Sequence, residues 1–101
     1  MFERKDISEQ EVQLQVTGSL DSEAAEQFQI ELSRLADGDH KTISLELSAV
    51  PSINSTCIGK ILLLRKSLSE QDRSIRISGC SDALYNVFQL IDLDKRIKID
   101  R

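Results

Sequence analysis

Two adjacent hydroxyl residues, Ser55 and Thr56, lie where a strand pattern gives way to a helical pattern. Apolar and polar residues alternate over residues 42–47, which predicts a half-buried strand, and Pro51 then ends sheet pairing because it has no N–H to donate. The N-terminus of a helix presents unpaired N–H groups and a partial positive charge. A hydroxyl at this turn therefore either caps the helix or carries a phosphate that the helix dipole favours.

The helix that follows the turn, expected over residues 55–71, has two different sides on a helical wheel. The broad apolar side, which we expect to pack on the core, carries Cys57, Ile58, Ile61, Leu62, Leu64 and Leu68. The other side carries Thr56, Lys60, Leu63 and Ser67. We therefore expect Thr56 to face outward, and we assign Ser55, just before the first full turn, mainly to capping.

Strand and helix patterns alternate along the rest of the chain. Strands are predicted over 11–17, 42–47, 74–78 and 97–99, and residues 1–10 are a weaker candidate for an added edge strand. Helices are predicted after Leu20-Asp21-Ser22, where Asp21 or Ser22 can cap, over 55–71, and after Ser81, with an apolar stripe of Leu84, Val87, Phe88 and Ile91. This order predicts an α/β fold with parallel strands joined by helical crossovers. Because the strands alternate, we expect helices mainly on one face of the sheet.

Length and composition favour one cytoplasmic domain over residues 1–101. A chain of 101 residues that is 40% hydrophobic can bury one core. Its 13 basic and 17 acidic residues give a formal net charge of -4, and no basic stripe interleaved with aromatic residues indicates nucleic-acid binding. The apolar run 61–64 is too short to span a membrane, and residues 1–6 lack the apolar segment of a signal peptide. We expect no nucleic-acid partner and no direct membrane insertion.

The residue types that catalysis or metal binding would need are not suitably arranged. The only histidine, His40, lies in an acidic turn where we expect it to be solvated, so a hydroxyl nucleophile has no evident base. The pair Gly59-Lys60 lacks the earlier glycine and the following hydroxyl of a phosphate-binding loop. Cys57 and Cys80 are expected to be reduced and structural, with a lowered thiol pKa at Cys57 as the alternative. We expect no catalytic residue, cofactor or metal.

Three motifs, taken in order, resemble the STAS domain family, and within it the single-domain anti-sigma factor antagonists of bacterial partner-switching systems. The motifs are Gly18-Ser19-Leu20-Asp21, the run from Leu45 to Gly59, and Ile77-Ser78-Gly79-Cys80-Ser81 followed by Val87-Phe88-Gln89-Leu90. The resemblance covers nearly the whole chain and implies a mixed sheet of four to five strands with helices packed mainly on one face.

The resemblance also implies a function. A protein of this kind is not an enzyme. Unphosphorylated, it binds an anti-sigma factor that is a GHKL-type serine-threonine kinase, or another switch protein, and phosphorylation releases it until a PP2C-type phosphatase restores binding. The family pattern puts the phosphate on Thr56, with Ser55 as the alternative. The implied partner-binding residues are Asp21, Asn54, Ser55, Thr56, Cys57, Lys60 and Leu63.

Two residues depart from the family pattern. Asn54 stands where the family usually has Asp, which removes a negative charge but keeps a good capping side chain. Cys57 stands where the family usually has Gly, which adds a side chain beside Thr56. An alternative function is that of a STAS regulatory subunit of an ABC lipid transporter, bound to the transporter's ATPase. A small enzyme remains only if a partner completes its site.

Overall fold

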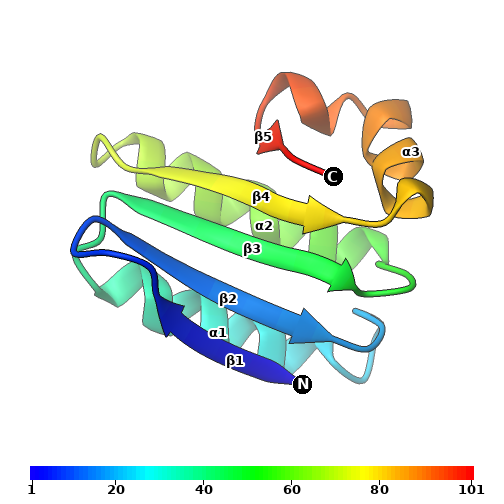
Figure 1. The fold of residues 1–101 in the computed structure, drawn as a ribbon, viewed down its shortest axis with the longest axis horizontal. Coiled ribbons are helices and arrows are strands. Elements are labelled where there is room, and N and C mark those ends of the chain that lie inside the picture. The colour runs from blue at the N-terminus through cyan, green and yellow to red at the C-terminus, as the bar shows by residue number, and fades with distance from the viewer.

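The sheet has five strands in the spatial order β1-β2-β3-β4-β5, in a computed structural model that describes all residues, 1–101 (Figure 1). The strands are β1 (Phe2–Asp6), β2 (Glu11–Thr17), β3 (Thr42–Ala49), β4 (Ser74–Cys80) and β5 (Lys98–Ile99). β1 pairs with β2 in the antiparallel sense, whereas every other neighbouring pair is parallel. The predicted α/β class and mixed sheet are confirmed, and the weak N-terminal pattern does form an edge strand.

The helices are α1 (Ala25–Asp37), α2 (Ser55–Ser69) and α3 (Asp82–Leu90), with a 3-10 turn η1 (Leu93–Lys95) before β5. α1 and α2 lie side by side behind the sheet, and α3 stands at the end of β4 (Figure 1). The core lies between this helical layer and the sheet, where Phe28 of α1, Leu45 of β3 and Ile61 of α2 are fully buried. Helices therefore cover mainly one face of the sheet, as predicted.

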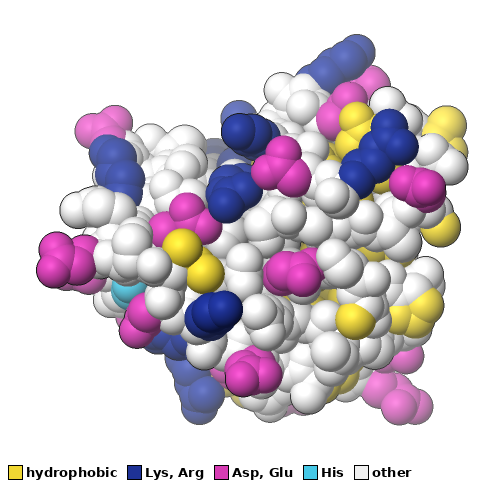
Figure 2. All heavy atoms as spheres, in the orientation of Figure 1, with side chains coloured by type: hydrophobic (Ala, Val, Ile, Leu, Met, Phe, Trp, Pro, Cys, Tyr) yellow, Lys and Arg dark blue, Asp and Glu magenta, His cyan; other side chains and the backbone are white.

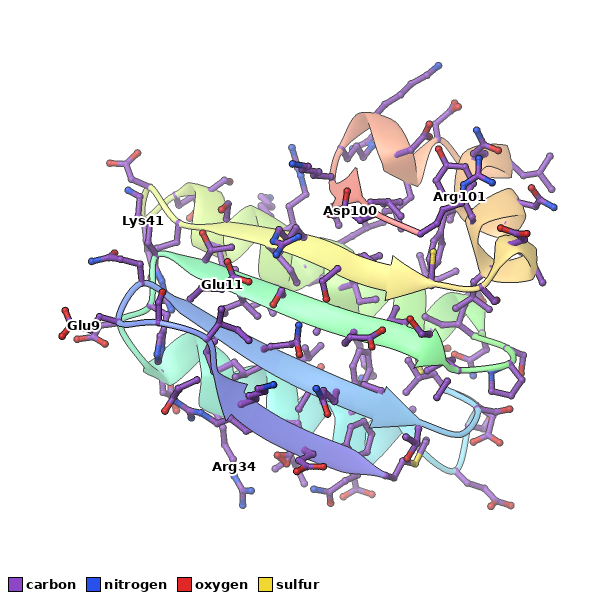
Figure 3. The ribbon with its side chains drawn as sticks, in the orientation of Figure 1. Glu9, Glu11, Arg34, Lys41, Asp100 and Arg101 are labelled. Atoms are coloured by element: carbon purple, nitrogen blue, oxygen red, sulfur yellow. The ribbon has the colours of Figure 1, made fainter.

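The other face of the sheet is polar and open. Gln13 of β2 donates a hydrogen bond to Ser78 of β4. Arg76 bridges the carboxylates of Glu11 and Asp100 at 3.1 and 2.9 Å, and Figure 3 labels these two acidic residues. Charged side chains of both signs are scattered over this face (Figure 2). No helix of the protein combines the length and the apolar character that crossing a membrane requires.

The apolar stripe predicted for α3 is only half right. Leu84 and Phe88 are buried, but Val87 and Ile91 are 40% and 47% exposed. These two pairs differ because α3 stands at the end of the sheet, where only the side carrying Leu84 and Phe88 meets the core. A helical wheel identifies which residues share a side of a helix. It does not show how much of that side the rest of the protein buries.

The prediction of a solvated His40 is wrong. Its side chain is only 14% exposed, and its Nε2 atom lies 3.4 Å from Oδ1 of Asp6 in the strand that the weakest pattern predicted. Arg73, which precedes β4, donates from Nε to the His40 carbonyl at 2.8 Å. His40 therefore belongs to contacts that join the end of β1 to the connection between α1 and β3, and it lies at the other end of β3 from Thr56.

Candidate functional site

The turn between β3 and α2 is held by a second loop, the one between β2 and α1. The backbone N–H of Leu20 donates to the Ser52 carbonyl at 2.9 Å, and the Asn54 N–H donates to the Leu20 carbonyl at 2.9 Å. The Ser52 hydroxyl also donates to the Ser19 hydroxyl at 3.1 Å. Because Leu20 is fully buried between these bonds, the two loops form one rigid platform at the ends of β2 and β3.

Asn54 is the N-cap of α2. It has extended backbone angles, φ -92° and ψ 168°, and its side-chain oxygen accepts a 2.8 Å hydrogen bond from the Cys57 N–H. The assignment of the cap to Ser55 is therefore wrong by one residue. A cap needs an extended backbone and an acceptor that reaches the N–H three residues on, and Ser55 is already the first helical residue.

The hydroxyls of Ser55 and Thr56 are not used by the cap. Both residues are exposed in the first turn of α2, as was predicted for Thr56. This turn contains no acidic residue, so within it nothing opposes the partial positive charge of the helix N-terminus. A phosphate on either hydroxyl would extend into solvent from a position that the helix dipole favours.

Cys57 lies beneath this surface and not on it. Its side chain is fully buried, with Sγ 3.9 Å from the Asp21 carbonyl. Burial raises the pKa of the Cys57 thiol; the Lys60 charge lowers it in part and the Asp21 charge adds to the rise. The alternative of a lowered thiol pKa is therefore wrong. The predicted role of Cys57 in partner contact is also corrected, because a fully buried thiol does not touch a partner.

Asp21 and Asn54 lie at the N-terminal end of α2 with the two hydroxyls. The exposed Asp21 accepts hydrogen bonds through Oδ1 from the backbone N–H groups of Glu23 and Ala24, both at 3.1 Å. It therefore organises the turn before α1, which begins at Ala25, later than the sequence suggested. Sequence reasoning missed Ser19 and Ser52, whose contact joins loops 33 positions apart and leaves no local pattern.

Lys60 and Leu63 continue along the same side of α2 from Thr56. Lys60 Nζ lies 3.3 Å from Oε1 of Gln29 on α1, and the Leu63 side chain is 69% exposed. Residues four and seven positions after Thr56 fall on its side of a helix, so a partner that covers Thr56 can also reach both. Of the seven predicted residues, four therefore lie at the N-terminal end of α2, Lys60 and Leu63 lie further along the side of Thr56, and Cys57 is buried below.

Gly79 helps to position the end of β3 that leads into the turn. A Cβ atom at Gly79 would lie 2.6 Å from the Ser48 hydroxyl and 2.7 Å from Oε1 of Glu46. That Glu46 oxygen accepts a 2.8 Å hydrogen bond from the Ser48 N–H. The absence of a side chain at Gly79 therefore leaves room for the Glu46 carboxylate to hold the last residues of β3. No group of three or more His, Cys, Asp or Glu side chains is placed to hold a metal ion.

The chain belongs to the STAS domain family, since the family model described as "Mlab, STAS domain" matches residues 3–99. A comparison with curated protein sequences gave no match. Among solved structures, the chain is similar to the anti-sigma factor antagonist SpoIIAA in its unphosphorylated form, with a TM-score of 0.83 and 20% identity over 100% of this chain and 89% of SpoIIAA. The phosphorylated form of SpoIIAA, a Bacillus cell fate determinant, gives a TM-score of 0.76 at 20% identity over 100% and 92% of the two chains.

Two other solved structures are similar over most of their length. A Thermotoga maritima protein, described as a candidate anti-sigma factor antagonist, has a TM-score of 0.86 and 29% identity over 99% of this chain and 86% of its own. A sulfate transporter family protein from Wolinella succinogenes has a TM-score of 0.78 and 17% identity over 94% and 80% of the two chains. The STAS fold and the similarity to anti-sigma factor antagonists are therefore confirmed.

Proposed function

We propose that this chain is a phosphorylation-gated binding protein of the anti-sigma factor antagonist type, with Thr56 as the phosphorylated residue and Ser55 as the alternative. The observation that carries the proposal is the position of Thr56. This residue is exposed in the first turn of α2, and Asn54 supplies the helix cap. The hydroxyl is thus available to a kinase without loss of the helix start. The similarity to SpoIIAA, solved in both phosphorylated and unphosphorylated forms, supports this assignment.

The unphosphorylated protein binds its partner through the surface that Thr56 shares with Lys60 and Leu63. A phosphate adds about -1.5 to -2 charges at pH 7. Where the partner offers no further cation beside Lys60, burying that charge costs several kcal/mol, and each 1.4 kcal/mol lowers affinity about tenfold. Phosphorylation at Thr56 therefore separates the partners.

The partner supplies the catalysis, and this chain supplies the surface. We infer that residues 1–101 act in the cytoplasm as one STAS domain that binds an anti-sigma factor of the GHKL kinase type, with a PP2C-type phosphatase acting in the reverse direction. The protein itself needs neither a base beside Thr56 nor a cofactor, because a kinase brings its own nucleotide and general base.

A second candidate function is a regulatory subunit of a transporter, bound to an ABC ATPase. The fold shared with a sulfate transporter family protein favours a transporter role in general, and the ABC ATPase is the partner that the family resemblance implies. In that case the same turn is a permanent contact, and Thr56 packs against the ATPase without being modified.

The test is to isolate the protein from its native host under several growth conditions and to measure its intact mass, with site mapping of any phosphate. Phosphate on Thr56, absent from a Thr56→Ala variant and retained in Ser55→Ala, is the expected result. In parallel, the wild type and Thr56→Glu are used to capture partners from the same lysate. If phosphate never occurs and Thr56→Glu captures the same ABC ATPase as the wild type, the transporter function replaces the switch.

A further inference from the structure

A groove lies between α1 and α2 on the side of α2 that carries Thr56. Its volume is about 210 Å³. Its apolar lining residues are Leu32 and Ala36 of α1 and Leu63 and Leu64 of α2, and Lys60 is its only charged one. The groove therefore combines an apolar floor with a single cation.

Lys60 has no acidic partner within the protein. Its Nζ contacts only the neutral Oε1 of Gln29 at 3.3 Å, across the groove, and none of the ion pairs of the chain includes it. A cation beside apolar side chains favours a ligand that brings both a carboxylate and an apolar surface.

The groove and Thr56 form one continuous line along α2. Thr56, Lys60, Leu63 and Ser67 follow one another at spacings of four, three and four residues, which spans about 16 Å of helix. A groove between two neighbouring helices receives a third helix when apolar side chains of the latter enter it at intervals of three and four residues. The groove itself extends along α2 from Lys60 to Ser67, about two helical turns, and a partner helix of about three turns would also reach Thr56.

We propose, on the basis of the function proposed above, that this groove docks an amphipathic helix of the same partner. Apolar side chains of that helix pack between Leu63 and Ala36. One of its carboxylates forms an ion pair with Lys60, which replaces the contact between Lys60 and Gln29. Phosphorylation then acts at the groove as well as at the turn. A phosphate on Thr56 lies one helical turn before Lys60, the arrangement in which an anion and a lysine attract one another best on a helix. It therefore competes with the partner's carboxylate for Lys60.

The test uses the partner captured by the unphosphorylated wild type and measures its dissociation constant for four variants. Leu63→Ala and Lys60→Gln should each weaken binding at least tenfold, as central contacts do. Leu90→Ala, which removes an even more exposed leucine on α3, should stay within about twofold. Thr56→Glu reports on the switch itself. Circular dichroism of each variant verifies the fold, which is expected to persist because Leu63, like Leu90, is exposed.

The outcomes separate the two proposals. If Leu63→Ala and Lys60→Gln bind like the wild type while Thr56→Glu does not, the groove proposal is overturned and the switch stands. If the groove variants lose binding but Thr56→Glu binds normally, the groove stands and the switch is overturned. A wild type that captures no partner overturns both.

A photo-cross-linking experiment identifies the occupant directly. Ser67, which lines the groove, is replaced by p-benzoylphenylalanine and the protein is irradiated with the partner present. The expected product contains a partner peptide with apolar residues at helical spacing and an acidic residue within one turn. A product with the mass of two copies of this chain, or one with a lipid attached, overturns the proposal of a partner helix.

Discussion

The side-chain oxygen of Asn54 accepts a 2.8 Å hydrogen bond from the backbone N–H of Cys57, and this single bond decides how the hydroxyls of the turn are used. Because Asn54 caps the helix, the hydroxyls of Ser55 and Thr56 are not needed to cap it. Because the Cys57 side chain is buried beneath them, it takes up no part of the protein surface around Thr56. The cap and the switch are thus carried by different residues.

The first prediction concerns this cap. Asn54→Ala should lower the free energy of unfolding by about 1 kcal/mol, because it removes the acceptor for an N–H at the start of α2. Ser55→Ala is the matched control and should change it by less than about 0.5 kcal/mol. Urea unfolding followed by circular dichroism measures both. A larger loss for Ser55→Ala than for Asn54→Ala would return the cap to Ser55.

The second prediction compares two glycines. Gly79→Ala should destabilise the fold by about 1 kcal/mol, because its Cβ displaces the Glu46 carboxylate from the Ser48 N–H. Gly59→Ala lies in α2 with no atom within 4 Å of its Cβ, so it should stabilise the fold by about 0.5–1 kcal/mol through helix propensity. Thermal unfolding of the two variants should therefore shift in opposite directions, and a shift in the same direction contradicts the account.

The third prediction concerns the buried thiol. Burial raises the pKa of Cys57 in the folded protein, whereas the unfolded thiol ionises near its ordinary pKa of about 8.5. The thiol's contribution to stability is therefore fully present below this pH and decreases as the pH rises toward the folded pKa. The stability difference between the wild type and Cys57→Ala should shrink above about pH 8.5. Urea unfolding from pH 7 to pH 10 measures it; a constant difference would mean that the folded thiol titrates normally.

The fourth prediction concerns the phosphate on Thr56. The second pKa of a phosphothreonine is about 6, and a nearby helix N-terminus and lysine both favour the dianion. Phosphorus NMR of the phosphorylated protein should therefore give a pKa below 6, and Lys60→Gln should raise it toward that value. Lys66→Gln, one charge changed on an exposed position of the same helix, is the control. Equal phosphate pKa values in all three proteins would mean that Lys60 does not interact with the phosphate.

The sequence predicted the order of the elements because alternating and helical periods report directly on which residues are buried. It placed Thr56 on the exposed side of α2 for the same reason. It missed the cap by one residue because asparagine and serine both cap helices well, so the pattern Asn54-Ser55 does not fix where the backbone turns helical.

The other misses depend on contacts between distant parts of the chain. His40 is shielded next to Asp6, which lies 34 positions earlier in a strand whose pattern was weak. Val87 is exposed because α3 meets the core with only one narrow side. The contact between Ser19 and Ser52 likewise requires two loops that only the folded sheet brings together. The periodicity of apolar residues within one segment does not predict contacts between distant segments.

The affinity of the captured partner for the protein with and without phosphate on Thr56 decides whether Thr56 is a switch. Isothermal titration calorimetry of the unphosphorylated and singly phosphorylated forms measures both dissociation constants. Phosphate should weaken binding about 100-fold or more, which corresponds to roughly 2.8 kcal/mol. Dissociation constants that agree within twofold would contradict it and would make Thr56 an unmodified contact.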